Sequence, residues 1–412
     1  MKIAVWHNLP SGGGKRALFD HVRGLVGRGH TVEAWSPPTA NGHYLPLSEL
    51  ITEHVVPATR RPEAPTYSLH NLLKLRTYNL RNLEELDDYA RQCAEEINQG
   101  DFDLLFANTS LEVAVSSIGR YVKIPKVLFL QEPSRWLYEA EPQLPWAAPM
   151  SNGKAWWSPA GITRSISNAV RIRGFRIQAR EEWLNADAFD TVLVNSFFSR
   201  EIVLHTYGVN AKVCYLGVDH HKFVNLHLPR ENFVVGIGAI APRKNIGLVI
   251  EALAEVSRSK RPRLVWIGDC SRAEYLEELT ELARKSAVDF TPAVGITDAQ
   301  LVDFLNRALM LVYTPRLEPF GYAPLEANAC GLPVVAVSEG GVRETVVDGV
   351  NGLLVEHDRR KVAAAIEHLL ENRETAARLG ENGERLIRER WTVEAAVERL
   401  EERLIEVLER GE

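Results

Sequence analysis

The chain has 412 residues, of which 45% are hydrophobic and 25% charged, the ordinary balance of a globular protein and enough length for two domains. A net charge of -6 excludes an overall attraction to nucleic acid, so any basic surface must be local. The four cysteines are widely separated and form no C-x-x-C pair, which excludes zinc-finger spacing and indicates reduced, buried thiols.

The amino-terminal stretch MKIAVWHNLPSGGG contains an apolar run that breaks at Pro10. This run is too short for the apolar region of a signal peptide. No apolar run in the sequence, this one included, reaches the roughly 18 residues that a membrane-spanning helix needs. We therefore expect a cytoplasmic protein, which can still be peripheral on the inner face of the membrane.

In the first half of the chain, short β-rich runs alternate with longer segments of helical spacing such as 83–99. The β-rich runs are 2–6, 31–35, 104–108, 126–130, 191–195 and 212–216. Alternation of this kind predicts a parallel sheet that is covered by helices on both faces.

The alternation lapses at GVDHHKFVNLHLPRE, a polar stretch that we interpret as a linker, with His220 and His221 as linker residues rather than metal ligands. It then restarts with β-rich runs at 233–238, 263–268, 288–291, 310–314 and 333–337. We predict an α/β protein with domains at 1–217 and 232–390, a linker at 218–231, and an amphipathic packing helix at 391–412. A ligand is expected where the carboxyl ends of the two sets of strands face each other.

The segment 153–180 differs from the rest of the first half because it contains no acidic residue. It interleaves basic and apolar side chains: Lys154, Trp156, Trp157, Ile162, Arg164, Ile166, Val170, Arg171, Arg173, Phe175, Arg176 and Arg180. Two interpretations fit equally well. The segment is either a solvated helix face over a core, or a surface that meets anionic lipid or a phosphorylated acceptor.

The strongest motif is TPRLEPFGYAPLEANACGLPVVA, which follows the strand at 310–314. Glu318 falls in a loop before Gly321, and Glu326 falls in a helix that starts near Tyr322. A loop, a glycine and a helix start together offer free backbone N–H groups to an anion. The two carboxylates can then hold two sets of hydroxyls, as a sugar and a ribose would require. The spacing alone fits a plain strand–turn–helix unit with incidental glutamates about as well.

Two other loops are candidate phosphate sites, one after the first strand of each half of the chain. The loop NLPSGGGKRALF places Gly12 and Gly13 before a helix, where backbone can approach a phosphate. The loop GAIAPRKN places Arg243 and Lys244 at a strand's carboxyl end, where cations suit a diphosphate. An ordinary βα turn and a surface loop remain the alternatives. No acidic residue ends the second strand, which argues against a dinucleotide cofactor.

The D-x-D pair of Asp101 and Asp103 precedes the strand at 104–108. Carboxylates at the amino end of a strand lie on the wrong side for a cleft, and no convergent oxygen ligands are visible. We therefore expect no metal and no cofactor.

Taken in order, these motifs resemble glycosyltransferase family 4, of the GT-B fold, over nearly the whole chain. The matching stretches are the GG of Gly12–Gly13, RGH at 28–30, NSFFSRE at 195–201, LGVD at 216–219, GAIAPRKN, the E-x7-E signature EPFGYAPLE, and GGVRETV. Trp391 in ERWTVE resembles the start of the family's final helix, which crosses back onto the N-terminal domain.

The resemblance implies a retaining, metal-independent transfer of a sugar from a UDP- or GDP-sugar to a glycan, lipid-linked or small-molecule acceptor. The nucleotide-sugar is then a co-substrate held mainly by the C-terminal domain. Glu318 would bind sugar hydroxyls near the reacting carbon, and Glu326 would bind the ribose. The remaining implied donor contacts lie along the sugar and diphosphate: Gly12, Gly13, Arg243, Lys244, Phe320, Gly321 and Tyr322.

The sequence departs from the family pattern at two places. Ala239 stands where an arginine is common, and Arg243 can substitute for it. Gln131 stands where a histidine is common, so a general base there is in doubt, while Glu132 and Arg135 are candidate acceptor contacts. A retaining transfer can proceed without a base if the leaving phosphate takes the acceptor's proton. The alternatives are a GT-B epimerase or phosphorylase, and a non-catalytic nucleotide-sugar-binding protein.

Overall fold

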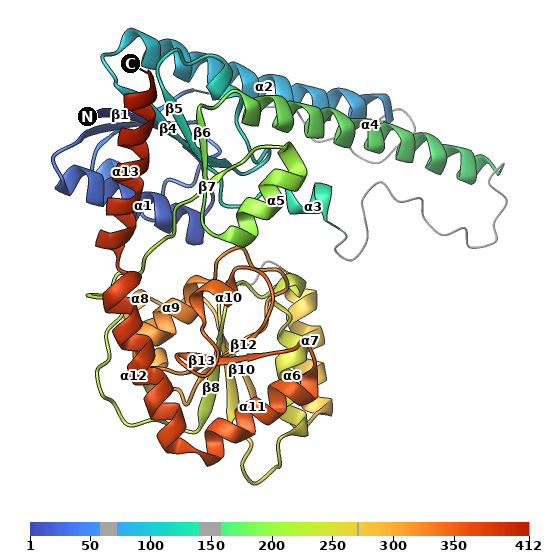
Figure 1. Ribbon diagram of the computed structural model, residues 1–412. Helices are drawn as coiled ribbons and strands as arrows, with labels where there is room; N and C mark the ends of the chain where they lie inside the picture. The colour runs from blue at the N-terminus through green and yellow to red at the C-terminus, as the bar shows by residue number, and fades with distance from the viewer. Residues whose placement is uncertain (58–71, 140–157, 270–271, 412) are drawn as a thin grey trace. The chain divides into compact units, whose positions relative to one another are not determined.

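The computed structural model describes residues 1–57, 72–139, 158–269 and 272–411, which divide into two units. The first unit comprises Met1–Tyr215 and Val397–Glu412, and the second comprises Leu216–Ala396. The chain therefore passes between the units at 215/216 and at 396/397, a few residues from the predicted 217 and 390. Each unit has its own sheet and its own apolar core (Figure 1).

The first unit is built on a parallel sheet with the order β3-β2-β1-β4-β5-β6-β7. The strands are rich in Val, Ile, Leu and Phe on both faces, as expected where helices cover both sides of a sheet. They are β1 (Lys2–Asn8), β2 (Thr31–Ser36), β3 (Thr52–Val55), β4 (Leu104–Ser110), β5 (Lys126–Phe129), β6 (Thr191–Val194) and β7 (Lys212–Val213).

The helices of this unit include two long ones that lie side by side, α2 and α4 (Figure 1). The helices are α1 (Gly13–Gly27), α2 (Leu72–Gln99), α3 (Arg135–Tyr138), α4 (Pro159–Asp187) and α5 (Phe197–Tyr207). Ser158 caps α4 by accepting a hydrogen bond from the Gly161 backbone N–H, and a proline occupies the first turn, where its missing N–H removes no helical hydrogen bond.

The last helix, α13 (Val393–Gly411), begins in the second unit and packs in the first along most of its length. A Cβ on Gly24 of α1 would lie 2.3 Å from a Val397 methyl, so only glycine lets the two helices approach this closely. Glu401 accepts hydrogen bonds from Arg28 at 2.7 Å and from His30 at 2.6 Å. The buried apolar stripe of α13 agrees with the predicted packing helix, although Trp391 ends the preceding helix instead of starting this one.

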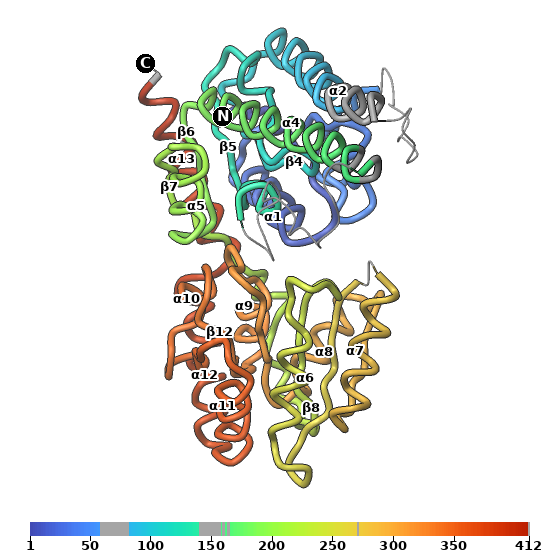
Figure 2. The backbone as a smooth tube through the Cα atoms, turned by 90° about the vertical axis from the view of Figure 1, so that its right-hand side faces the viewer, coloured from blue at the N-terminus to red at the C-terminus, as the bar shows by residue number. Residues whose placement is uncertain are grey.

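The second unit repeats the plan with a parallel sheet of order β10-β9-β8-β11-β12-β13. Its strands are β8 (Phe233–Ile237), β9 (Arg263–Ile267), β10 (Phe290–Ala293), β11 (Leu311–Tyr313), β12 (Val334–Val337) and β13 (Gly352–Val355). Its helices are α6 (Ile246–Glu255), α7 (Ala273–Lys285), α8 (Asp298–Arg307), α9 (Tyr322–Ala329), α10 (Val342–Thr345), α11 (Arg359–Glu371) and α12 (Arg373–Arg390). Helix α11 packs against α6, and α12 against α9 (Figure 2).

The segment predicted as a linker, 218–231, is fastened to the second unit. The Arg230 guanidinium donates hydrogen bonds to several backbone carbonyls, including those of Asn306 at 2.8 Å and Gly331 at 2.9 Å. Asn306 in turn accepts from the Leu226 backbone N–H at 2.7 Å. The polar composition of this segment therefore correctly predicted irregular structure, and hydrogen bonds hold the segment against the second unit.

Two strands were absent from the sequence prediction, β3 and β13. Both are short edge strands. TEHV in β3 is polar and half exposed, so it has no apolar run, whereas GLLV in β13 is apolar but short and follows the glycine-containing turn DGVN. Asp103 of the D-x-D pair accepts a hydrogen bond from the Lys2 backbone N–H at 2.6 Å, a structural contact at the amino end of the sheet. Among the described residues, no helix is both long and apolar enough to cross a membrane.

Candidate functional site

The candidate site of the second unit lies where β8 and β11 are neighbours and the chain turns outward in opposite directions from them. Ligands of open parallel sheets bind at such a switch point, beyond the carboxyl ends of the strands. Two contacts join the loops that leave these strands: Thr314 Oγ1 donates to the Asn245 carbonyl at 3.2 Å, and the Arg316 N–H to the Arg243 carbonyl at 3.3 Å.

Lys244 lies in the loop after β8, in a single 3₁₀ turn formed by Pro242–Lys244, and only 7% of it is exposed. Its aliphatic stem covers Gly238, where a Cβ would lie 3.1 Å from the lysine Cδ and Cε. Its Nζ donates a hydrogen bond to Glu318 Oε2 at 2.7 Å. The neighbouring Arg243 is exposed, so the two adjacent cations have different surroundings.

The loop that carries Glu318 is locked against a pair of glycines, Gly340 and Gly341. The Gly341 N–H donates to the Glu318 carbonyl at 2.8 Å. A Cβ on Gly340 would lie 2.4 Å from that same carbonyl oxygen, and a Cβ on Gly341 would lie 2.1 Å from the Pro319 carbonyl oxygen. Any side chain at either position would push the loop away, so the two glycines fix the position of Glu318.

Helix α9 starts directly after this loop. Gly321 precedes it with φ 95, a left-handed conformation that favours glycine, and the first turn contains no acidic residue. The first N–H groups of a helix have no partner inside the helix and carry its partial positive charge. The rings of Phe320 and Tyr322 meet edge to face at 5.6 Å at this helix start.

Glu326 lies one turn further along α9 and is 3% exposed. Tyr313, at the end of β11, lies close to both glutamates. Burial raises the pKa of Tyr313 well above its usual value, and the charges of Glu318 and Glu326 raise it further, so its phenol stays protonated and donates to Glu318. The sequence analysis missed Tyr313, because nothing distinguishes one tyrosine in an apolar strand from a core residue.

The predicted residues of the first unit gather at the carboxyl edge of its own sheet. Gly12 and Gly13 are exposed at the start of α1, and a Cβ on Gly14 would lie 3.7 Å from Gln131 Cγ. Gln131 Oε1 accepts from Asn195 Nδ2 at 3.0 Å, while its Nε2 is buried without a hydrogen-bond partner among the described residues.

Glu132 and Arg135 follow Gln131 in the chain. Arg135 donates from Nε to Glu139 at 2.7 Å, and its Nη1 lies 3.9 Å from Glu132. The structure therefore brings the glycine loop and Gln131 together, and joins Glu132 to Arg135 in a small cluster of charges.

A buried charge cluster in the first unit was not predicted. His7 Nε2 lies 3.2 Å from Glu53 Oε1 and 3.4 Å from Lys15 Nζ, and both His7 and Lys15 are buried. Burial lowers the pKa of His7 and that of Lys15, and the hydrogen bond from His7 lowers the pKa of Glu53. Glu53 belongs to the edge strand that the sequence did not reveal, so this cluster could not be predicted.

A cavity of about 330 Å³ lies beside this sheet, between α2, α4 and the end of β4. Its lining is mixed: the serines Ser110, Ser116 and Ser117, the rings of Trp6 and Tyr121, and the charged Asp87, Arg120 and Glu181. Tyr121 donates to Asp87 at 2.7 Å and Arg120 to Glu181 at 2.9 Å. The Asn185 amide oxygen at its wall is buried without a hydrogen-bond partner among the described residues.

A family model accounts for most of the second unit. Residues 218–386 match the model of the family described as Glycosyl transferases group 1. The matched segment contains Arg243, Lys244, both glutamates and the Gly340–Gly341 turn.

Several proteins of similar sequence are named as glycosyltransferases. The chain is 30% identical over 280 residues to the α-1,3/1,6-mannosyltransferase alg-2 of Neurospora crassa, with 56% of this chain and 59% of that one aligned. It is 26% identical over 266 residues to the human α-1,3/1,6-mannosyltransferase ALG2, with 58% of this chain and 64% of that one aligned. An uncharacterized glycosyltransferase of Methanocaldococcus jannaschii is 29% identical over 186 residues, 45% of this chain and 48% of its own length. The chain thus spans about half to two thirds of these relatives.

Solved structures agree over nearly the whole chain. The Anabaena protein Alr3699/HepE in complex with UDP aligns with a TM-score of 0.69 at 19% identity, covering 98% of this chain and 100% of that one. Sucrose-phosphate synthase from Thermosynechococcus elongatus aligns with a TM-score of 0.69 at 19% identity, covering 99% of both chains. At such identities the likeness shows the fold alone: two Rossmann-like domains of the GT-B class, as the sequence predicted.

Proposed function

We propose that the protein is a retaining glycosyltransferase that takes a hexose from a UDP- or GDP-sugar held by its second unit. The observation that carries the proposal is the Lys244–Glu318 ion pair of 2.7 Å at the switch point of the second sheet, inside the segment that matches the glycosyltransferase family. Mannosyltransferases among the similar sequences, and a UDP complex among the similar structures, support this class of donor.

We propose that the diphosphate binds at the part of this site that carries positive charge. Lys244, the exposed Arg243 and the first N–H groups of α9 present positive charge at one edge of the sheet. As the bond between the anomeric carbon and the phosphate oxygen breaks, negative charge grows on the leaving diphosphate. Cations and dipoles that are already in place stabilise this charge without reorganising.

The sugar is assigned to Glu318 and the ribose to Glu326. Glu318 is fixed by Lys244, Tyr313 and the glycine pair, so its carboxylate can accept hydrogen bonds from sugar hydroxyls without a loss of side-chain freedom. The acceptor hydroxyl attacks on the face from which the diphosphate leaves, and a phosphate oxygen takes its proton. This step needs no general base, which suits Gln131, whose amide cannot accept a proton at neutral pH.

The acceptor is assigned to the first unit. Its cavity of about 330 Å³ falls within the usual size range of a small-molecule site, and its lining combines hydroxyls, aromatic rings and paired charges. A lining of this kind suits a saccharide or polyol, which offers many hydroxyls and apolar C–H faces. The acceptor is therefore proposed to be a glycan or a sugar-bearing lipid headgroup.

A donor screen tests the proposal. Purified protein is heated with UDP-, GDP- and ADP-sugars, and the unfolding midpoint is compared with that of the free protein. A ligand at 100 times its Kd should stabilise the folded state by about 2.7 kcal/mol. Release of nucleoside diphosphate on addition of glycan or lipid-linked acceptors then reports transfer, and the anomeric configuration of the product reports retention. Stabilisation without any release would favour a non-catalytic nucleotide-sugar-binding protein, and failure of every nucleotide-sugar to stabilise would overturn the proposal.

Transfer is proposed to need no divalent metal, because Lys244 and the helix start already supply positive charge where the diphosphate leaves. Activity should survive exhaustive dialysis against EDTA. Loss of activity that returns with Mn²⁺ or Mg²⁺ would show that a metal carries this charge instead.

The exposed face of α4 is proposed to contact anionic lipid. Ile162 and Ile166 are exposed there, as are the cations Arg171, Arg173, Arg176 and Arg180. Lys154, Trp156 and Trp157 of the same predicted surface lie outside the described residues. Each cation near an anionic surface contributes about 1 kcal/mol to binding.

Vesicle binding tests this surface. Charge reversal of Arg171, Arg173 and Arg176 to Glu should abolish flotation with phosphatidylserine vesicles, with phosphatidylcholine vesicles as the neutral control. The matched variant reverses three exposed arginines of the second unit, Arg360, Arg373 and Arg378. Equal binding by both triple variants would leave α4 as an ordinary solvated helix face.

A further inference from the structure

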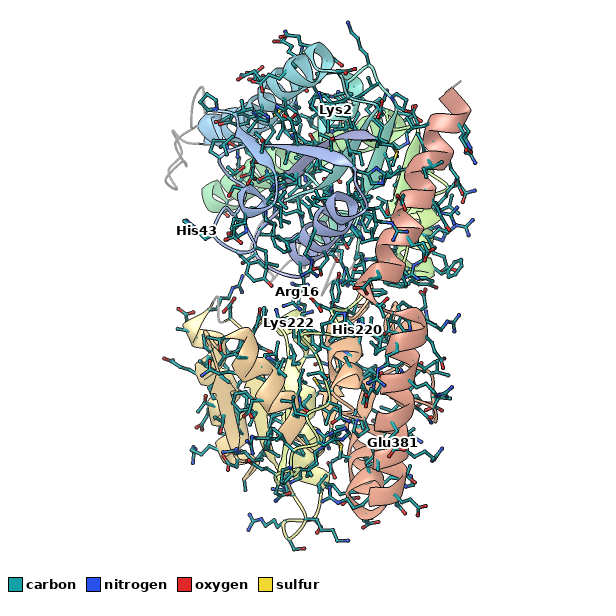
Figure 3. The ribbon with its side chains drawn as sticks, turned by 90° about the vertical axis from the view of Figure 1, so that its left-hand side faces the viewer. Lys2, Arg16, His43, His220, Lys222 and Glu381 are labelled. Atoms are coloured by element: carbon teal, nitrogen blue, oxygen red, sulfur yellow. The ribbon has the colours of Figure 1, made fainter. Side chains whose placement is uncertain are left out.

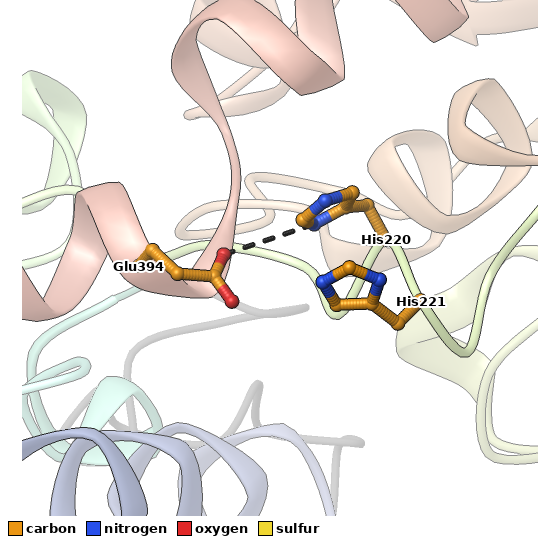
Figure 4. Close-up of side chains that lie close together, drawn as sticks. All are labelled: His220, His221 and Glu394. Atoms are coloured by element: carbon orange, nitrogen blue, oxygen red, sulfur yellow. Dashed lines mark ion pairs between the residues drawn. The ribbon is translucent and has the colours of Figure 1, made fainter. Parts of the chain in front are cut away.

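A cluster of three metal-ligating side chains lies outside the donor and acceptor sites, in the second unit. His220, His221 and Glu394 each offer one ligand atom, and these atoms all lie within 4.8 Å of one another (Figure 4). His220 Nδ1 lies 3.7 Å from Glu394 Oε2, which is too far for a hydrogen bond. This nitrogen is buried and has no hydrogen-bond partner among the described residues.

The 3.7 Å separation is close to that of two ligands on one tetrahedral metal ion. Zinc–ligand bonds of about 2.0–2.2 Å at tetrahedral angles place ligand atoms roughly 3.4 Å apart. The two imidazole rings lie 4.1 Å apart between centroids, so both histidines face the same small region.

The backbone on both sides of the cluster is already held in place. Val218 forms a parallel bridge with Thr392, and the Val218 N–H donates to the Trp391 carbonyl at 2.8 Å. A Cβ on Gly217 would lie 2.1 Å from the Thr392 carbonyl oxygen, so the two segments are in direct contact.

Local hydrogen bonds also fix the direction of each ligand-bearing segment. The Asp219 carboxylate accepts a hydrogen bond from the His221 N–H at 3.1 Å, which fixes the turn that carries the histidines. Thr392 Oγ1 accepts from the Ala395 N–H at 3.1 Å at the start of α13, beside Glu394. The ligands are thus brought together by the fold and need only side-chain rotation to meet on one ion.

The cation that is adjacent to the histidines in the chain, Lys222, is already paired with a carboxylate. Lys222 follows the histidines in the chain, and Figure 3 shows both His220 and Lys222 on this segment. Its ammonium forms an ion pair with Asp298. Two imidazoles and one carboxylate suit Zn²⁺, with a fourth position left for water.

We propose that His220, His221 and Glu394 bind one Zn²⁺ ion that ties together the two segments by which the chain passes between its units. The histidines follow the first crossing, at 215/216, and Glu394 precedes the second, at 396/397. This departs from the sequence analysis, which assigned the histidine pair to the linker. The third ligand, Glu394, is distant in the chain, so only the fold brings it to the histidines. The site is separate from the donor residues and does not depend on the proposed transfer reaction.

The test measures zinc binding by tag-free, metal-depleted, full-length protein in competition with a chromophoric chelator. The variants are His221→Ala and Glu394→Gln, which remove one ligand each from exposed positions. The matched control is His227→Asn, an exposed histidine of the same segment outside the cluster, whose left-handed φ of 53 asparagine tolerates. Circular dichroism and the unfolding midpoint of the metal-free variants check that each one folds.

The unaltered protein and His227→Asn should bind one equivalent of Zn²⁺, and each ligand variant should bind it more than about 100-fold more weakly, beyond the loss typical of an outer-shell change. Co²⁺ in place of Zn²⁺ should give the visible absorption of a tetrahedral or five-coordinate ion, lost in both ligand variants. Zinc should also raise the unfolding midpoint of the unaltered protein but not of the ligand variants. Failure of the unaltered protein to bind, or equal affinity in the ligand variants, would overturn the proposal.

Discussion

In the second unit, the charged residues at the switch point, Lys244 and Glu318, come from loops that follow two neighbouring strands of the sheet but lie 74 residues apart in the chain. Gly340 and Gly341 pack against the loop of Glu318. In the first unit, the polar cluster of His7, Lys15 and Glu53 joins two strands and a helix, and its His7 and Lys15 side chains are buried. The two sheets share the order of their first six strands, yet in the second unit the charged side chains lie on loops that glycines hold in place, and in the first unit they are buried. Because of this difference, the proposed donor binding can be tested by substitutions in the second unit that leave the first unit intact.

The largest expected effect concerns Lys244, set against its neighbour Arg243. Lys244→Ala should lower kcat about 100-fold or more, corresponding to about 3 kcal/mol, because a preorganised cation is lost and the Glu318 carboxylate loses its ammonium partner. Arg243→Ala removes an exposed cation and should cost less than about tenfold, mainly in donor KM. Steady-state kinetics of both variants make the comparison, and equal losses would mean that burial of the cation is irrelevant.

The second largest expected effect concerns the close packing of Gly341 against the loop that carries Glu318. Gly341→Ala places a Cβ 2.1 Å from the Pro319 carbonyl oxygen, at an ordinary φ, so its effect is purely steric. Overpacking of this kind costs about 1–3 kcal/mol, and the displaced loop should weaken donor binding.

Donor affinity and the unfolding midpoint are measured in parallel for Gly341→Ala. Gly247→Ala, on α6 of the same unit, meets only an ordinary 3.6 Å contact with Leu282 and serves as the control. A Gly341→Ala variant with unaltered affinity would show that this close packing does not position the loop.

The smallest effect concerns acid stability in the first unit. His21 is fully buried between Phe106 and Phe129, and burial lowers its pKa to about 3. Below about pH 6.5 the unfolded chain binds a proton at His21 that the folded chain does not accept until about pH 3, so stability falls as the pH drops through this window. At pH 5 the loss should reach about 2 kcal/mol relative to pH 7.

Hydrogen exchange reports this loss separately for each unit. Peptides that cover β4 and β5 should lose protection between pH 7 and pH 5 after correction for the intrinsic exchange rate, and His21→Leu should remove most of that change. Peptides of the second sheet act as the internal reference, because among the described residues both histidines classed as buried, His7 and His21, belong to the first unit. An identical pH response in His21→Leu would show that other groups control acid stability.

The sequence predicted the two parallel sheets, and it predicted that Lys244 and Glu318 lie in loops after strands, because both features depend on local patterns. Apolar runs identified the buried strands, and the two glycines of GGVRETV mark a place where backbone packs on backbone, while Gly321 of EPFG adopts a left-handed φ. The sequence analysis did not predict β3, because TEHV is polar and contains no apolar run. It therefore could not place Glu53 beside His7 and Lys15. Tyr313 escaped for a related reason, since its contact with Glu318 depends on a loop that folds back onto the end of its strand.

The central claim is that Glu318 acts on the sugar and Glu326 on the ribose. Donor-varied steady-state kinetics of Glu318→Ala and Glu326→Ala, after confirmation that both fold, test it most directly. Loss of Glu318 should fall on kcat, because a carboxylate near the reacting carbon binds more tightly as the ring gains positive charge. Loss of Glu326 should raise donor KM and leave kcat nearly unchanged. The expected loss of donor-binding free energy is about 1.5–3 kcal/mol, the contribution of a hydrogen bond to a charged group. The reverse pattern would contradict the role assignment, and two fully active variants would contradict the glycosyltransferase account itself.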